Sequence, residues 1–101
     1  MGSNDKILYE DTAKKVTFIL FDDKFGKKIR LKFPYNPYIV KLIKATDWKI
    51  THRTFEPDSK NWTIDYSKES LNEVLGQVSE DVTSTTYISF IKGINSSFME
   101  L

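Results

Sequence analysis

The 101-residue sequence contains no cysteine, four glycines, three prolines and a single histidine. Without cysteine it can form neither a disulfide framework nor a thiolate metal site, and it suits a reducing compartment, so we expect an intracellular protein of the cytoplasm or nucleus. No apolar run approaches the roughly 20 residues that a membrane-spanning helix needs. Residues 1–13 are polar and acidic and do not contain the apolar core of a signal peptide. We therefore expect no membrane partner.

The residue types that usually carry catalysis are scarce. An acid–base site commonly uses histidine or a pair of carboxylates with shifted pKa values, and nothing next to His52 in the sequence marks it as a base. One histidine without cysteine cannot complete a structural zinc site. The Asp22-Asp23 pair is typical of a turn, because the further oxygen ligands of a calcium loop do not follow it. Gly26 stands alone rather than in a phosphate-binding glycine motif, so the sequence predicts a non-enzymatic chain with neither metal nor cofactor.

The chain does contain the material for a compact core, together with an uneven distribution of charge. Of its residues 40% are apolar and 14% aromatic, which is enough for one folded domain. Residues 14–60 hold twelve basic and five acidic side chains, a net charge of +7, whereas residues 1–13 and 61–101 carry −2 and −4. If the fold gathers the central cations on one face, they form the electrostatic surface of a nucleic-acid-binding protein. Otherwise these lysines only keep exposed strands soluble.

Alternating apolar and polar residues predict two β-hairpins. Strands at 16–21 and 28–33 form the first, with Gly26 free to take a positive φ in the turn between them. Strands at 48–55 and 62–66, joined by a turn-rich segment, form the second.

Capping residues and apolar spacing predict the helices. Asn36 caps a first helix that Pro37 opens, and Ser67 caps a second helix whose apolar residues recur at helical spacing. In the tail, residues 85–91 have strand propensity, but the apolar residues of 85–101 fall at helical spacing, which favours a helix.

The resulting order of elements, ββαββα followed by a tail, predicts an α+β fold. In this fold an antiparallel sheet built from two hairpins carries its helices on one face. We expect a flexible lead-in at residues 1–13, a core domain at 14–80 and a C-terminal segment at 81–101. That last segment either packs on the core or forms an interface.

The cations of the central section share one side of the first hairpin. Lys28, Arg30 and Lys32 alternate along their strand with apolar residues. If the second hairpin lies beside the first, its basic residues extend this face into a continuous patch, and Tyr35 can stack on a base from the rim. The candidate nucleic-acid-binding residues are Lys24, Lys27, Lys28, Arg30, Lys32, Tyr35, Lys49, Arg53 and Lys60.

Four further side chains are assigned to structural positions. Phe33, Trp48 and Trp62 match the apolar registers of their segments, and we expect them in the core rather than against a base. His52 falls on a predicted strand, and we expect it at the surface or at the edge of the sheet.

A spaced pattern of aromatic residues runs through the middle of the chain. Phe33 and Tyr35 precede the first predicted helix, and the turn at 60–62, Lys-Asn-Trp, precedes the second. Across residues 29–75 this order resembles the HARP domain of annealing helicases, and it is similar to segments that precede the catalytic part of some tyrosine recombinases. The departure is that Phe55 occupies the aromatic position nearest the turn, where the family has a basic residue close to Trp or Tyr. The resemblance implies binding of single-stranded or forked DNA without catalysis.

We therefore expect a non-catalytic nucleic-acid-binding module, accessory to a helicase or recombinase. Its ligand would be DNA, single-stranded or forked, on the basic sheet face, with RNA as the alternative. The competing hypothesis is a protein-interaction or dimerisation module, such as an adaptor or inhibitor from a mobile element. That module would use the predicted strand at 16–21, which is apolar on both faces, and the apolar residues of 85–101 if the tail does not fold back over the sheet.

Overall fold

A computed structural model of the protein describes residues 5–101, which form a five-stranded sheet and four helices. The strands in chain order are β1 (Lys6–Asp11), β2 (Val16–Asp23), β3 (Gly26–Lys32), β4 (Thr54–Glu56) and β5 (Asn61–Asp65). The helices are α1 (Pro37–Ala45), α2 (Trp48–Thr51), α3 (Lys68–Gly76) and α4 (Thr85–Met99). Every strand pair is antiparallel, and the order across the sheet is β1-β2-β3-β5-β4. The predicted α+β class is confirmed.

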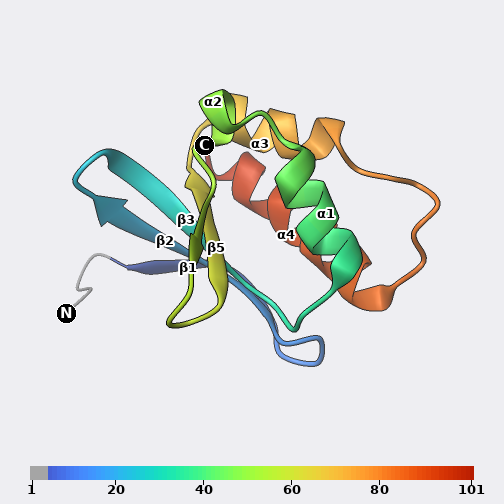
Figure 1. The fold of residues 1–101 in the computed structure, drawn as a ribbon. Helices are drawn as coiled ribbons and strands as arrows, with labels where there is room; N and C mark the ends of the chain where they lie inside the picture. Colours follow the sequence, from blue (N-terminus) through green and yellow to red (C-terminus); the bar gives the residue numbers. More distant parts are fainter. Residues whose placement is uncertain (1–4) are drawn as a thin grey trace.

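The helices are layered on the sheet around α4 (Figure 1). This helix lies against β1 and β2, and both α1 and α3 pack against it. The short helix α2 contacts α3 and β5. We call the side of the sheet that points away from α4 the open face.

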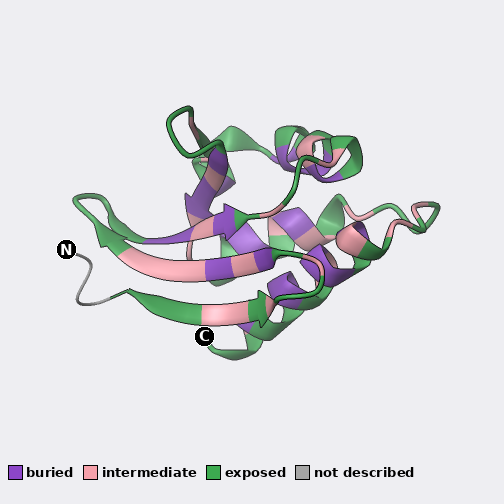
Figure 2. Ribbon diagram, turned by 90° about the horizontal axis from the view of Figure 1, so that it is seen from below, coloured by how far each residue is buried: buried purple, intermediate pink, exposed green. Residues whose placement is uncertain are grey.

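The core fills the space between the sheet and the helices (Figure 2). Phe18 of β2 and Phe90 of α4 are fully buried, and their rings meet edge to face with centroids 5.2 Å apart. Phe33 packs against the same Phe90 ring at 5.6 Å. Edge-to-face pairs of this kind add to the stabilisation from apolar burial. Gly93 lets α4 approach closely, because a Cβ there would lie 2.7 Å from ring carbons of both Phe18 and Tyr9.

The caps and turns that the sequence predicts are present. The Asn36 side chain accepts hydrogen bonds from the backbone N–H groups of Tyr38 and Ile39, at 3.0 and 3.2 Å, which satisfies the start of α1. The Ser67 hydroxyl does the same for α3. Gly26 has a φ of 119°, as expected for the turn between β2 and β3.

The prediction of a flexible lead-in at residues 1–13 is wrong for Lys6–Asp11, which form the edge strand β1. The side chains that fix this strand bond to α4, far along the chain. The Tyr9 hydroxyl lies 2.9 Å from the Ser89 hydroxyl, and Ser89 donates to the Asp11 carboxylate at 2.7 Å. This hydrogen bond also lowers the pKa of Asp11. The polar composition of residues 1–13 therefore did not reveal the strand, in which the side chains of Tyr9 and Asp11 are hydrogen-bonded to Ser89.

The predicted strand at 48–55 is also wrong over its first half. Asp47 caps a short helix, since its side chain accepts from the backbone N–H of Lys49 at 2.9 Å. Only Thr54–Glu56 pairs with β5. Trp48, which we expected in the core, is 57% exposed, because the helical turn carries its side chain outward.

The C-terminal segment folds back over the sheet as α4. Tyr87, Phe90 and Ile94 are buried in the core, and the exposed apolar side chains of this segment are Ile88, Met99 and Leu101. The condition on which an interface at 85–101 depended, a tail that leaves the sheet, is therefore not met. None of the helices in residues 5–101 has the length and apolar character needed to cross a membrane.

Candidate nucleic-acid interface

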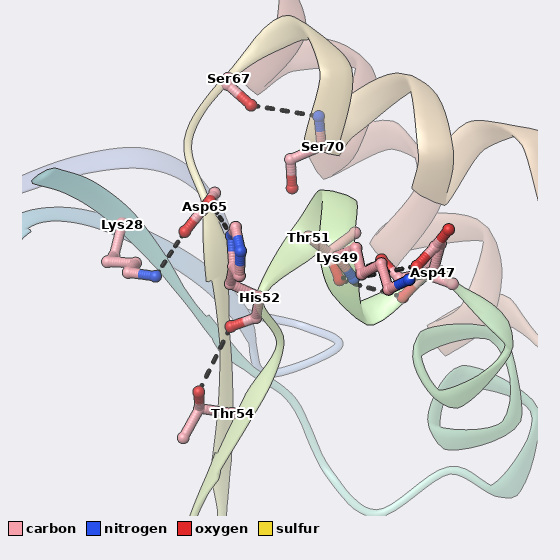
Figure 3. Close-up of polar contacts among 10 residues, drawn as sticks. Lys28, Asp47, Lys49, Thr51, His52, Thr54, Asp65, Ser67 and Ser70 are labelled. Atoms are coloured by element: carbon pink, nitrogen blue, oxygen red, sulfur yellow. Dashed lines mark hydrogen bonds and ion pairs between the residues drawn. The ribbon is translucent and has the colours of Figure 1, made fainter. Parts of the chain in front are cut away.

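The predicted basic strand face exists, but most of its charge is neutralised. Ile29 and Leu31 are buried in the core, so the alternate residues of β3 point to the open face as expected. Lys28 is only 9% exposed there, and its ammonium group forms an ion pair with the Asp65 carboxylate of β5 (Figure 3). Of the three cations on this face, Lys32 is exposed and has no ion pair within residues 5–101.

Arg30 is held in the same way by the neighbouring hairpin. Its Nε and Nη2 donate to the two carboxylate oxygens of Glu56 at 2.8 and 3.1 Å, and its guanidinium lies 4.3 Å from the centroid of the Phe21 ring. The hydrogen bonds that Arg30 donates to Glu56 lower the pKa of Glu56 and raise that of Arg30. The Glu56 carboxylate neutralises the charge of this guanidinium and takes two of its five N–H donors, which makes Arg30 a weaker partner for a phosphate.

Four other candidate cations are divided among three places. Lys24 and Lys27 are exposed at the turn between β2 and β3, and Lys27 pairs with Asp22 at 3.1 Å. Lys49 is exposed on α2. Arg53 has a structural role, since its guanidinium donates to the backbone carbonyl of Thr46 at 2.7 Å.

The two remaining candidates, Tyr35 and Lys60, line one cleft. This cleft, which we call the aromatic cleft, has a volume of about 510 Å³ and lies on the helix side of the sheet, among α1, the segment that leads into it and the β4–β5 hairpin. Its lining residues are Phe33, Tyr35, Val40, Lys44, Phe55, Ser59, Lys60, Asn61 and Trp62. Four of these nine are aromatic, two are lysine and none is acidic.

The geometry of the cleft follows from strand pairing. Phe55 and Trp62 are cross-strand partners whose ring centroids lie 5.2 Å apart, so they form one wall. Tyr35, in the connection between β3 and α1, is 82% exposed. Neither Lys44 nor Lys60 takes part in an ion pair within residues 5–101. The aromatic cleft therefore offers ring faces and unpaired positive charge together.

The aromatic cleft also unites the residues on which the resemblance to the HARP domain rests. Phe33, Tyr35 and the 60–62 turn are far apart in the sequence, and all of them contribute to its lining. The prediction that Phe33 and Trp62 belong to the core is partly met, because both pack against the core but remain partly accessible. Lys44 was missed as a candidate, because in the sequence it is one more lysine on the polar side of a helix.

The open face contains a second polar cluster around Asp65 (Figure 3). One carboxylate oxygen pairs with Lys28, and the other lies 2.6 Å from Nδ1 of His52. Burial raises the pKa of Asp65, but the hydrogen bonds from Lys28 and His52 outweigh that effect and leave the pKa below its ordinary value. His52 is exposed, as expected, and its backbone is left-handed with a φ of 49°. Its acidic partner is 13 residues away in sequence, so the sequence near His52 does not show the pair.

Comparison of the chain with family models, with curated proteins and with solved structures finds no match. The resemblance to the HARP domain stays a prediction.

Proposed function

We propose that this chain is a non-catalytic nucleic-acid-binding module that holds a single strand, or the unpaired strand of a fork, in the aromatic cleft. The observation that supports the proposal is the composition of that cleft, four aromatic side chains and two unpaired lysines without a carboxylate. Proteins that bind single strands without sequence preference combine these same two elements, aromatic platforms for bases and cations for the backbone. As the resemblances to the HARP domain and to recombinase segments imply, the chain would be accessory to a helicase or a recombinase.

The size of the cleft favours unpaired nucleotides over a duplex. A volume of about 510 Å³ is in the range of pockets that enclose a small ring-bearing ligand, so it suits one or two bases and not a paired helix. DNA is our proposed ligand, and RNA is the alternative because stacking on aromatic rings does not distinguish the two sugars.

This proposal places the ligand away from the open face that the strand pattern indicated. On the open face Lys28 and Arg30 are bonded to carboxylates, so an incoming phosphate would compete with existing ion pairs. Within residues 5–101, neither Lys44 nor Lys60 has an ion pair with which a phosphate would compete. We do not propose the dimerisation alternative, because the apolar centre of α4 is used in the core.

Fluorescence anisotropy with labelled single-stranded, forked and duplex oligonucleotides over a salt series tests the proposal. We expect binding at low salt, with higher affinity for single-stranded and forked oligonucleotides than for duplex. The variant Y35A should lose about 5- to 150-fold in affinity, which corresponds to the stacking of one base. Tyr35 is exposed, so this change leaves the core intact.

A pair of double variants with equal charge change locates the ligand. K44A/K60A should weaken binding and reduce the slope of log K against log salt by about 1.4, because each backbone contact to a single strand contributes roughly 0.7. K24A/K49A removes two exposed lysines that do not line the cleft and should change neither quantity. Equal losses in both double variants, or no binding at low salt, would overturn the proposal.

A further inference from the structure

The open face is hollowed at its end nearest α2, on the opposite side of the sheet from the aromatic cleft. The hollow has a volume of about 730 Å³. The end of the β2–β3 hairpin supplies Phe21, Asp23 and Phe25 as one wall, and Trp48 and His52 form the wall across from it. Strands β3, β4 and β5 provide the floor.

Two of the chain's own cations in and beside this hollow are in ion pairs. Lys28 pairs with Asp65, and Arg30 pairs with Glu56. By contrast, Asp23 accepts a hydrogen bond at 2.6 Å from the backbone N–H of Lys24 but has no ion pair within residues 5–101. Lys24, next to Asp23, likewise has no ion pair within residues 5–101. The side chains that line the hollow include three carboxylates, Asp23, Glu56 and Asp65, against one lysine, Lys28, and this excess favours a cation over a nucleic acid.

The aromatic rings of the hollow show how a cation is held there. The Arg30 guanidinium lies 4.3 Å from the Phe21 ring centroid, and the Lys24 ammonium lies 5.3 Å from that of Phe25. Trp48 is the ring type that attracts cations most strongly, is 57% exposed, and has no cation of residues 5–101 over its face. Two rings of the hollow are thus occupied by cations of the chain, and the third is vacant.

His52 adds a hydrogen-bond acceptor beside the vacant ring. The rings of His52 and Trp48 are nearly perpendicular, with centroids 5.3 Å apart. In the neutral imidazole that donates its Nδ1 proton to Asp65, the other nitrogen, Nε2, is an acceptor. His52 is the C-cap of α2, and its left-handed backbone ends that helix.

We propose that the hollow is a second binding site, which takes an arginine side chain from a partner protein. The guanidinium stacks on Trp48 and donates to Nε2 of His52, while Asp23 provides the charge that attracts it. Arginine fits better than lysine because its planar group stacks on a ring and donates several hydrogen bonds at once. The site is independent of the aromatic cleft, and the two would take ligands of opposite charge.

NMR titration with the peptide acetyl-Gly-Arg-Gly-amide tests this proposal. The chain has two tryptophans and one histidine, so each indole and imidazole signal reports one place. We expect saturable shifts at Trp48 and His52 and none at Trp62, which lines the aromatic cleft. The citrulline peptide has the same shape without the charge, and its affinity should be at least about tenfold lower than that of the arginine peptide.

A matched pair of variants completes the test. W48A should abolish the shift of His52, whereas Y38A, which removes an exposed ring outside the hollow, should retain it. Equal binding of the citrulline peptide, shifts centred on Trp62, or no shift at millimolar arginine peptide would each overturn the site. Oligonucleotide binding by W48A should equal that of the wild type, so failure of this site and failure of the nucleic-acid proposal give different results.

Discussion

At the scale of single residues, Gly93 fixes the distance between α4 and the sheet. A methyl group at this position would lie 2.7 Å from ring carbons of Phe18 and Tyr9, inside van der Waals contact. Phe18 is fully buried and has no free space into which to move. The fold therefore depends on the absence of a side chain here, although nothing in the local sequence distinguishes Gly93 from a glycine that only weakens a helix.

We expect G93A to lower the free energy of unfolding by roughly 1–3 kcal/mol, the usual cost of overpacking a core. Urea denaturation measures this cost. Gly76, the last residue of α3, is the matched control, because a Cβ there meets nothing within 4 Å. G76A should raise stability by about 0.5–1 kcal/mol, as alanine does in a helix. A G93A protein as stable as G76A would show that α4 can move away from the sheet at little cost.

At the scale of elements, the sequence correctly predicted the helix caps and turns, which depend on interactions between residues close in the chain. The caps of Asn36 and Ser67 act within three residues, and Gly26 acts within its own turn, so each is visible in a short window. The strand β1 is different, since the Tyr9 hydroxyl is satisfied by Ser89, 80 residues away. Its existence follows from tertiary contacts that no local pattern shows. The same holds for α2, where the Asp47 cap overrides the β-branched neighbours.

In the candidate site too, the features set by local sequence were predictable and those set by tertiary packing were not. Strand alternation correctly placed Lys28 and Arg30 on one face, because side-chain direction is a local property. Their partners, Asp65 and Glu56, lie 37 and 26 residues further along, so the loss of free charge was not visible. Lys44 joins the cleft only because α1 lies across from the β4–β5 hairpin, which is again a matter of tertiary packing.

The β4–β5 turn contains a residue in an unfavourable conformation. Lys60 has a φ of 58°, in the left-handed region where a side chain costs roughly 1 kcal/mol or more relative to glycine. We expect K60G to raise the free energy of unfolding by about 1 kcal/mol and, since Lys60 lines the aromatic cleft, to weaken oligonucleotide binding. Urea denaturation and fluorescence anisotropy on the same samples measure the two effects.

The β1–β2 turn supplies the control for this variant. Lys15 also has a φ of 58° but does not line the cleft. K15G makes the same change in charge and backbone, so it should raise stability similarly and leave binding unchanged. Reduced binding by K15G would mean that overall charge, and not position, explains the effect of K60G.

At the scale of the whole molecule, the uneven charge of the sequence becomes two surfaces separated by the sheet. The aromatic cleft combines rings with two lysines and no carboxylate, whereas the hollow on the open face combines rings with three carboxylates and one lysine. Between them, acids of residues 54–65 neutralise cations of β3 and hold the β4–β5 hairpin against the rest of the sheet. The net charge of +1 therefore does not show that the two surfaces differ in local charge.

These internal ion pairs make the stability of the molecule depend on acid pH. The pKa values of Asp65 and Glu56 are lower in the folded chain than their ordinary values, so the unfolded chain binds protons more readily. The stabilisation that these two carboxylates provide is complete above the ordinary carboxyl pKa of about 4 and is lost as the pH falls through the lowered pKa.

We expect D65N to lower the free energy of unfolding by roughly 1–3 kcal/mol at pH 7, because it leaves the nearly buried Lys28 without a counter-charge. Below about pH 4 its stability should approach that of the wild type. Urea denaturation at pH 7, 5 and 3 measures both effects, and D58N, at an exposed turn, should stay within about 0.5 kcal/mol of the wild type throughout. If D65N keeps the full acid dependence of the wild type, other carboxylates hold the hairpin in place.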